Sequence, residues 1–177
     1  MPAIARRMAL CLLLPVALTR AAAQDDQALQ LMNEGMALIG GADAAEARRG
    51  VDLLEQAAHR GAPVMVLLGD VYRHGIGIPA DPSKAARWYR VGAEMGDGLA
   101  QFELARLYLT GRGVAPDLVR AGLYLQLADA HVRDQGVRNQ VRELMGHVRL
   151  RATARDWEQI RRLVTGWRPK ELDDLLN

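Results

Sequence analysis

Apolar residues in the centre of the chain recur at the three- and four-residue spacing of an amphipathic helix. Leu68 and Tyr72 lie four residues apart and therefore share one face of the predicted helix. Gly75 and Gly77 follow, and glycines at these positions end a helix and permit the positive φ angles of a tight reversal. The pattern predicts a helix followed by a sharp turn.

A second helix is predicted directly after that turn. Asp81 is a helix N-cap, and Pro82 occupies the first helical position, where the missing N–H costs nothing. Ala85 is small enough to let two helices approach closely, and Trp88 is expected to fill the space between them. Gly96 ends this helix. The two helices form an antiparallel pair with one apolar face, which needs a neighbour to cover it.

The same pattern returns after a shift of 36 residues, which takes Leu68 to Leu104. The other matched positions of the second stretch are Tyr108, Gly111, Gly113, Asp117, Ala121 and Tyr124. Because a repeat of this length is one supersecondary unit that stacks on its neighbours, the chain is predicted to be all-α, a short α-solenoid of antiparallel helix pairs.

The repeat resembles the Sel1-like repeat family, a relative of the tetratricopeptide repeats. The resemblance rests on Leu68-Gly69-x-x-Tyr72-x-x-Gly75-x-Gly77, then Asp81-x-x-Lys84-Ala85-x-x-Trp88-Tyr89. It is strongest over residues 62–96. The copy at 97–131 has Ala105 in place of a glycine and Arg120 in place of a lysine, and a degenerate first copy is expected at 27–61. The resemblance implies a bacterial protein-binding scaffold.

Residues 132–177 are predicted to form a helical cap, because the last repeat of a solenoid would otherwise expose its apolar face. Thr153 and Asp156 have the spacing of a capping box, which begins a helix. Pro169 prevents that helix from continuing. The solenoid proper is therefore expected to occupy residues 24–131.

The N-terminus has the pattern of a secretory signal peptide. Arg6 and Arg7 precede a short apolar run, and Ala21-Ala22-Ala23 supplies a small-residue cleavage site. We expect residues 1–23 to be removed by a cut before Gln24, which places the mature protein in the periplasm or outside the cell. The alternative is an N-terminal anchor helix, although the apolar run is short for a membrane span.

Removal of that segment changes the composition. The chain has 23 basic and 21 acidic residues, and without Arg6, Arg7 and Arg20 the rest carries 20 basic and 21 acidic residues. The high isoelectric point is therefore poor evidence for nucleic-acid binding, which we do not expect. The single cysteine, Cys11, lies within the signal segment, so no disulfide and no thiolate ligand are expected in the mature chain.

Candidate catalytic residues are sparse. Ser83 is the only serine and lies in the first turn of a predicted helix, where a structural role outweighs that of a nucleophile. The four histidines have no i, i+4 pair that would hold a metal. The Gly-x-Gly elements follow helices rather than strands, which excludes a phosphate loop. We predict no enzyme, no cofactor and no metal site.

A candidate partner-binding surface lies on the first helices of the two good copies. The second copy has Gln101 and Glu103 at two positions where the middle copy has the apolar residues Met65 and Leu67. If these helices line the concave face, an exposed apolar strip is expected there. The strip would contain Met65, Leu67, Val71 and Leu107, and the candidate polar contacts beside it are Asp70, Arg73, Gln101, Glu103 and Arg106. The alternative is that the degenerate first copy covers the strip.

A second candidate surface is the cap. Residues 24–132 carry 10 basic and 14 acidic residues, whereas residues 133–177 carry 10 basic and 7 acidic residues. The arginines that dominate the cap are Arg138, Arg142, Arg149, Arg151, Arg155, Arg161 and Arg162. Such a patch suits an acidic partner or an anionic envelope polymer, and the alternative is a solvated helix face.

These patterns favour a non-catalytic adaptor that binds a protein partner. The resemblance to exported Sel1-like proteins implies scaffolding in the bacterial cell envelope or regulation of a membrane-bound protein. Contact with the membrane is expected only through that partner, and the protein is expected to be a monomer. The alternative function is binding of peptidoglycan or polysaccharide through the arginine-rich cap.

Overall fold

The computed structural model describes residues 25–41 and 43–176, and the expected signal segment with its cleavage site lies outside these residues. The described residues form helices joined by turns and loops, and they contain no strand. Residues 25–39 form the first helix. The helices that follow are α2 (Ala44–His59), α3 (Met65–His74), α4 (Pro82–Glu94), α5 (Gly98–Thr110), α6 (Leu118–His131), α7 (Gln135–Arg151), α8 (Ala154–Gly166) and α9 (Asp173–Leu176).

Aspartates begin most of these helices. The side chain of Asp81 accepts hydrogen bonds from the backbone N–H groups of Ser83 and Lys84, and Pro82 follows the cap at the first helical position. Asp43, Asp97, Asp117 and Asp134 cap the helices that follow them in the same way. Each cap satisfies backbone donors that have no partner within the helix. The sequence therefore specifies the helix starts locally.

The turns of the two copies have the same geometry. Gly75 and Gly111 end α3 and α5 in the left-handed region, at φ 69° and 70°. The backbone N–H of Asp81 then donates to the carbonyl of Tyr72 at 2.8 Å, and that of Asp117 donates to Tyr108 at 3.1 Å. A side chain at Gly113 would collide with the backbone of Pro82. Glycine is required there because the turn of one copy touches the helix start of the other.

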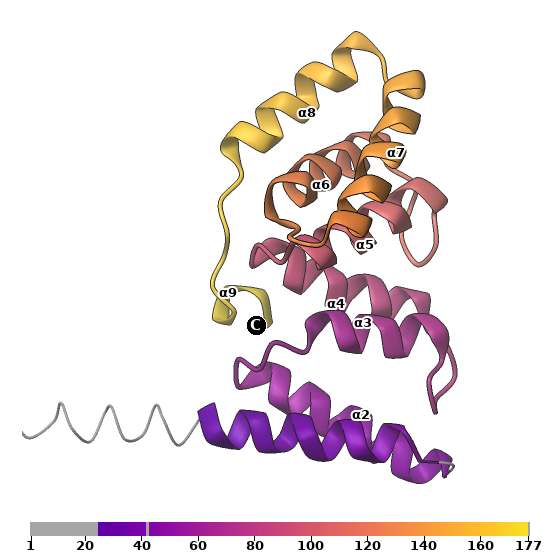
Figure 1. Ribbon diagram of the computed structural model, residues 1–177, viewed down its shortest axis with the longest axis vertical. Helices are drawn as coiled ribbons and strands as arrows, with labels where there is room; N and C mark the ends of the chain where they lie inside the picture. Colours follow the sequence, from indigo (N-terminus) through magenta and orange to yellow (C-terminus); the bar gives the residue numbers. More distant parts are fainter. Residues whose placement is uncertain (1–24, 42, 177) are drawn as a thin grey trace, which may run out of the picture.

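The helix pairs stack along the long axis of the molecule (Figure 1). The helix at 25–39 lies with α2 at one end, followed by α3 with α4, and then α5 with α6. One apolar core runs through the stack. Its largest fully buried side chains are Tyr89, Leu54, Leu68, Leu104, Leu125 and Ile160. The prediction of an all-α, short solenoid is confirmed.

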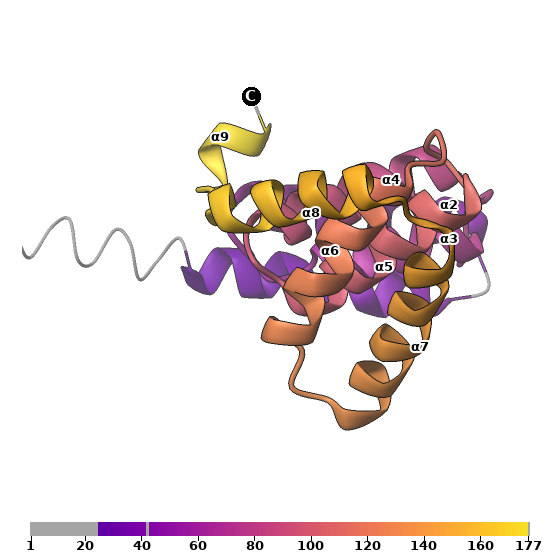
Figure 2. The same ribbon diagram turned by 90° about the horizontal axis from the view of Figure 1, so that it is seen from above.

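Helices α7 and α8 close the other end of the stack. Both pack on α6, while Figure 2 shows them diverging from each other. The predicted capping box of α8 is present, with reciprocal bonds between Thr153 and Asp156. Ile160 lies against Gly122 of α6, where a Cβ atom would come within 2.5 Å of the isoleucine side chain. The glycine therefore lets α8 approach α6 closely.

The chain then returns along the stack. Residues 167–176, here called the C-terminal strap, run from the end of α8 back to α9, which lies at the level of α3 and α4 (Figure 1). The Trp167 ring lies 5.6 Å from the ring of His131 at the end of α6. Lys170 binds Glu94 at the end of α4, through its backbone N–H at 2.8 Å and through its ammonium at 3.0 Å.

Candidate partner-binding surface

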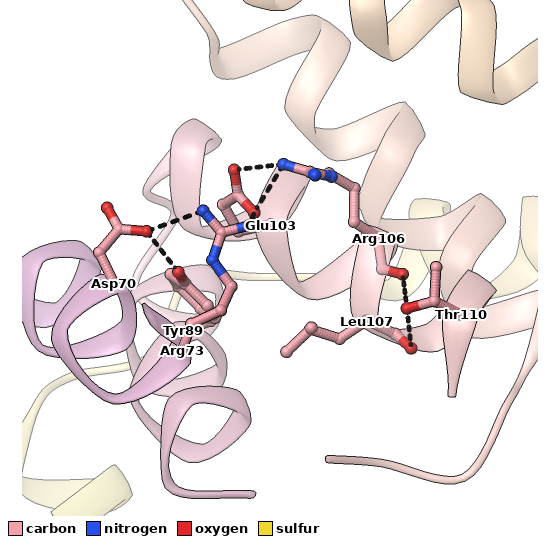
Figure 3. Close-up of polar contacts among 7 residues, drawn as sticks. All are labelled: Asp70, Arg73, Tyr89, Glu103, Arg106, Leu107 and Thr110. Carbon is pink, nitrogen blue, oxygen red and sulfur yellow. Dashed lines mark hydrogen bonds and ion pairs between the residues drawn. The ribbon is translucent and has the colours of Figure 1, made fainter. Parts of the chain in front are cut away.

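Helices α3 and α5 carry the predicted polar residues, and an ion-pair network joins them (Figure 3). The guanidinium of Arg73 on α3 lies between two carboxylates, at 3.1 Å from Asp70 and 2.9 Å from Glu103. Arg106 on α5 pairs with the same Glu103 carboxylate at 3.0 Å. The contact between Arg73 and Glu103 connects the two copies directly.

Tyr89 of α4 joins this network through a hydrogen bond to Asp70. Its hydroxyl donates to Asp70 at 2.6 Å, and its ring is fully buried. Burial first, and then the bond to Asp70, raise the pKa of the Tyr89 hydroxyl far above its usual value. A Cβ atom at Gly69 would meet the Tyr89 ring at 2.4 Å, so glycine is needed to seat the ring beneath α3.

The two arginines that share Glu103 differ in exposure. The side chain of Arg73 is 16% exposed and that of Glu103 is 9% exposed, whereas Arg106 is 43% exposed. Removing one partner of a largely buried ion pair costs stability, because the other charge is left buried without a partner. An exposed ion pair contributes little to stability. Arg73 is therefore a structural link between the copies, and Arg106 is the part of the network that solvent or a partner reaches.

The prediction of an exposed apolar strip is wrong, because most of its side chains are buried. Met65 is 5% exposed, Leu107 is 4% exposed and Val71 is fully buried. Met65 packs toward Gly92 of α4, where a Cβ atom would come within 3.2 Å of the Met65 Cβ. The physical reason is that a first helix in the middle of a solenoid is covered by its own second helix and by the adjacent copies, which leaves only a narrow free face.

Two of the predicted polar contacts are buried as well. Gln101 is fully buried, where its amide donates to the carbonyl of Ala93 at 3.1 Å and its oxygen lies 2.9 Å from Nδ1 of His131. Glu103 is buried as well and accepts hydrogen bonds from the two arginines. These polar side chains hold the fold together, so the accessible members of the predicted set are Leu67, Asp70 and Arg106, with Arg73 partly covered.

The accessible face offers charge and one apolar side chain. At the two ends of the network, Asp70 keeps 37% of its side chain exposed and Arg106 keeps 43%, and Leu67 is half-buried. Thr110 lies further along α5 and donates its hydroxyl to the carbonyl of Arg106 at 2.8 Å. Among the described residues no cluster of three or more histidine, cysteine or acidic side chains could hold a metal. The geometry suits recognition of a polar protein surface.

Sequence reasoning missed a basic row on α4. Lys84, Arg87 and Arg90 are all exposed and lie three residues apart, which places them near one another on the helix surface. Trp88, expected between the helices, is instead half-buried, with its ring 6.4 Å from that of His59 on α2. The buried aromatic ring of this helix is Tyr89. The three-residue spacing of the cations was the available signal, hidden by the net acidity of residues 24–132.

The seven arginines predicted to dominate the cap fall into two groups. Arg161 and Arg162 both bind Glu158, Arg142 lies 3.7 Å from Asp129, and Arg138 donates to the carbonyl of Val132. The two arginines beside Glu158 lower the pKa of its carboxyl group. Arg149, Arg151 and Arg155 are exposed and form no salt bridge within residues 25–41 and 43–176. Only the second group is a free cationic surface.

The fold defines a class, the short α-solenoid, and comparison with known proteins identifies the repeat. The Sel1 repeat family matches residues 62–97 and 98–128. The chain therefore contains two Sel1 repeats. Repeats of this family typically mediate protein–protein interaction and generally form non-enzymatic scaffolds. No match was found among the curated proteins.

Solved structures with the same fold support this assignment. One is a protective antigen of uropathogenic Escherichia coli strains with an SLR fold, at 25% identity and a TM-score of 0.66, covering 84% of this chain and 31% of the antigen. Another is a Sel1 repeat protein from Oxalobacter formigenes, at 25% identity and a TM-score of 0.53, covering 65% of this chain and 35% of that protein. The chain thus spans about a third of the length of each.

No helix of the described residues combines the length and apolar character needed to cross a membrane.

Proposed function

We propose that this protein is a non-catalytic adaptor of the bacterial cell envelope that binds another protein through the exposed face of α3 and α5. The observation that carries the proposal is the network of Asp70, Arg73, Glu103 and Arg106, which fixes charged groups on two stacked Sel1 repeats. Because these side chains are already held in place, a partner would lose little free energy in ordering them. Repeats of the family bind protein partners in general.

The location in the envelope rests on the sequence. The basic residues, apolar run and small-residue site within residues 1–23 have the pattern of a cleavable export signal. We propose that the mature protein works as a monomer in the periplasm or outside the cell, regulates a membrane-bound partner, and reaches the membrane only through it.

Binding measurements on variants of the α3/α5 face test the proposed surface. The mature chain, labelled at its C-terminus, is used to capture partners from an envelope extract, and the captured protein is purified and its Kd measured. The double variant Leu67→Ala and Arg106→Ala should weaken binding at least tenfold, because it removes the accessible apolar and cationic groups of this face. The single variant Arg49→Ala, exposed on α2, is the control.

Equal Kd values for the double variant and the native chain would exclude this face. Failure to capture a stoichiometric protein under any condition would count against the adaptor function itself. Circular dichroism confirms that both variants keep native helicity. Variants of Met65 or Leu107 are unsuitable for this purpose, because both side chains are buried in the core.

Binding of an envelope polymer is the second candidate function. The observation that favours it is the exposed group Arg149, Arg151 and Arg155, which lacks salt-bridge partners within the described residues. Binding to purified sacculi that weakens with salt, and that the triple change of these arginines to glutamine abolishes, would support this function. Salt-independent binding, or none, would contradict it.

A further inference from the structure

A groove that shares no lining residue with the α3/α5 network lies between α2 and α4. It has a volume of about 490 Å³ and is lined by α2 and α4, with Glu55 and His59 on one side and Trp88 and Val91 on the other. The last described residues of the chain, Leu175 and Leu176, also line it. The groove is therefore partly occupied by the chain's own C-terminus.

The occupant has a definite chemical character. The strap ends in Glu171-Leu172-Asp173-Asp174-Leu175-Leu176, three acids interleaved with three leucines. All three leucines are half-buried, whereas the acidic side chains are exposed. Within α9 and its first turn, the backbone N–H of Asp174 donates to Glu171 and that of Leu175 donates to Leu172. One turn of helix thus presents adjacent leucines to the groove.

The groove is complementary to such a segment. Trp88 and Val91 supply half-buried apolar contacts, and Lys84, Arg87 and Arg90 form the basic row beside them. None of these three cations forms a salt bridge within the part of the chain that the structure describes. Since exposed charges act over about 10 Å at moderate salt, the row favours an acidic segment in the groove.

The root of the strap is fixed by specific contacts. Trp167 and Lys170 are tied to His131 and Glu94, and the leucines at the tip are half-buried in the groove. Because the root holds the tip close to its own groove, occupation within one molecule is favoured over exchange of tails between two copies.

We propose that the α2/α4 groove is a docking site for a protein segment that combines adjacent leucines with acidic residues. The chain's own C-terminal strap occupies the site until such a segment displaces it. This inference rests on the proposed protein-binding function and adds to it a second surface, the chemistry of its ligand and a built-in competitor.

The test uses the full mature chain and a fluorescent peptide with the sequence of residues Glu171–Leu176. In the variant Leu175→Asp plus Leu176→Asp the tip no longer competes, and fluorescence anisotropy should show that the peptide binds. The native chain should bind the same peptide at least fivefold more weakly, because its tethered tip competes at an effective concentration of roughly millimolar. A peptide with both terminal leucines replaced by serine should not bind.

The groove itself is tested by adding Lys84→Glu and Arg87→Glu to the tip variant, which should abolish peptide binding. Absence of binding to the tip variant, or equal binding to the tip variant and the native chain, would overturn the proposal. A native chain that dimerises by exchanging tails, seen by light scattering, would assign the groove to a second copy and overturn it as well.

A second measurement covers the case in which the tip variant loses its helicity. Arg87→Glu alone alters one exposed side chain, and it should speed hydrogen exchange of the amides of residues 172–176 several-fold. Unchanged exchange would overturn the proposal. None of these readouts involves the α3/α5 face, so a negative result leaves the adaptor function standing, and loss of partner capture through that face leaves the groove standing.

Discussion

The two matched Sel1 repeats have the same turn geometry, here called the frame, and differ in the side chains packed in their cores. In the first, Gly69 makes room for the ring of Tyr89, whose hydroxyl reaches Asp70. The equivalent positions of the second repeat are Ala105 and Leu125, both fully buried and apolar. The second repeat therefore has alanine in place of the glycine and leucine in place of the tyrosine. In the first repeat the two positions share one volume, and the second repeat has a larger residue at one of the equivalent positions and a smaller residue at the other.

The frame that both repeats keep lies at their outer edge. Lys84 lies over the ring of Tyr72 at 4.9 Å, and its equivalent Arg120 lies over Tyr108 at 5.6 Å. The turn bonds to these tyrosines are also equivalent. The turn geometry is therefore independent of the core filling. The buried polar contacts of the first helices differ, since Tyr89 bonds Asp70 of α3, whereas Gln101 of α5 bonds Ala93 and His131.

The largest expected loss of stability comes from enlarging Gly69 beside the ring of Tyr89. Gly69→Ala should destabilise the protein by about 3 kcal/mol, since the new methyl group collides with the fully buried Tyr89 ring. Adding Tyr89→Leu, which copies the second repeat, should recover more than half of the loss. Chemical denaturation measures both values, and an additive double variant would show that the two positions do not share a volume.

The next effect separates the two arginines that share Glu103. Arg73→Ala should cost about 2 kcal/mol, because Glu103 loses its covered partner. Arg106→Ala is the matched control and should cost at most about 1 kcal/mol, because that pair is far more exposed. Urea unfolding of the two variants tests the contrast. Equal losses would mean that burial does not distinguish the pairs.

High pH should weaken the first repeat through Tyr89. Its pKa is raised in the folded state, so the stabilisation is complete below the unfolded tyrosine pKa of about 10 and is lost as the pH rises above it. The loss is at most about 1.4 kcal/mol per pH unit for this group. Unfolding between pH 8 and 11, compared for the native chain and Tyr89→Phe, should show a shallower decline in the variant. Identical slopes would contradict the assignment.

The smallest effect concerns the shared frame. Lys84→Ala and Arg120→Ala should each cost about 0.5 kcal/mol, the magnitude of an exposed cation–aromatic contact. The two losses should agree, and the measurement is thermal unfolding of both variants beside the native chain. A clearly larger loss for one of them would mean that the frames of the two repeats are not equivalent.

The sequence predicted the local parts of this structure well. The caps at Asp81 and Asp117, the turns at Gly75 and Gly111, and the capping box at Thr153 all occur as expected. Each of these depends on backbone conformation and on hydrogen bonds within a few residues. Such signals are present in the chain wherever it folds, which is why a single repeat suffices to identify them.

The candidate site was predicted less well. Asp70, Arg73, Glu103 and Arg106 were selected as separate surface contacts, and the structure joins them in one network. Helical spacing gives the face on which a residue lies but not how many neighbours cover that face. Met65 and Leu107 were for this reason expected at the surface, although adjacent helices bury them.

By itself, the sequence determined the repeat, its turns and helix starts, and the capping helix, because short-range backbone chemistry encodes them. Tertiary structure alone decided which side chains remain accessible, that Arg73 links two repeats, and that the C-terminal strap returns to the groove beside α4. These features depend on the stacking of segments far apart in the chain, and no local pattern records which surfaces that stacking brings together.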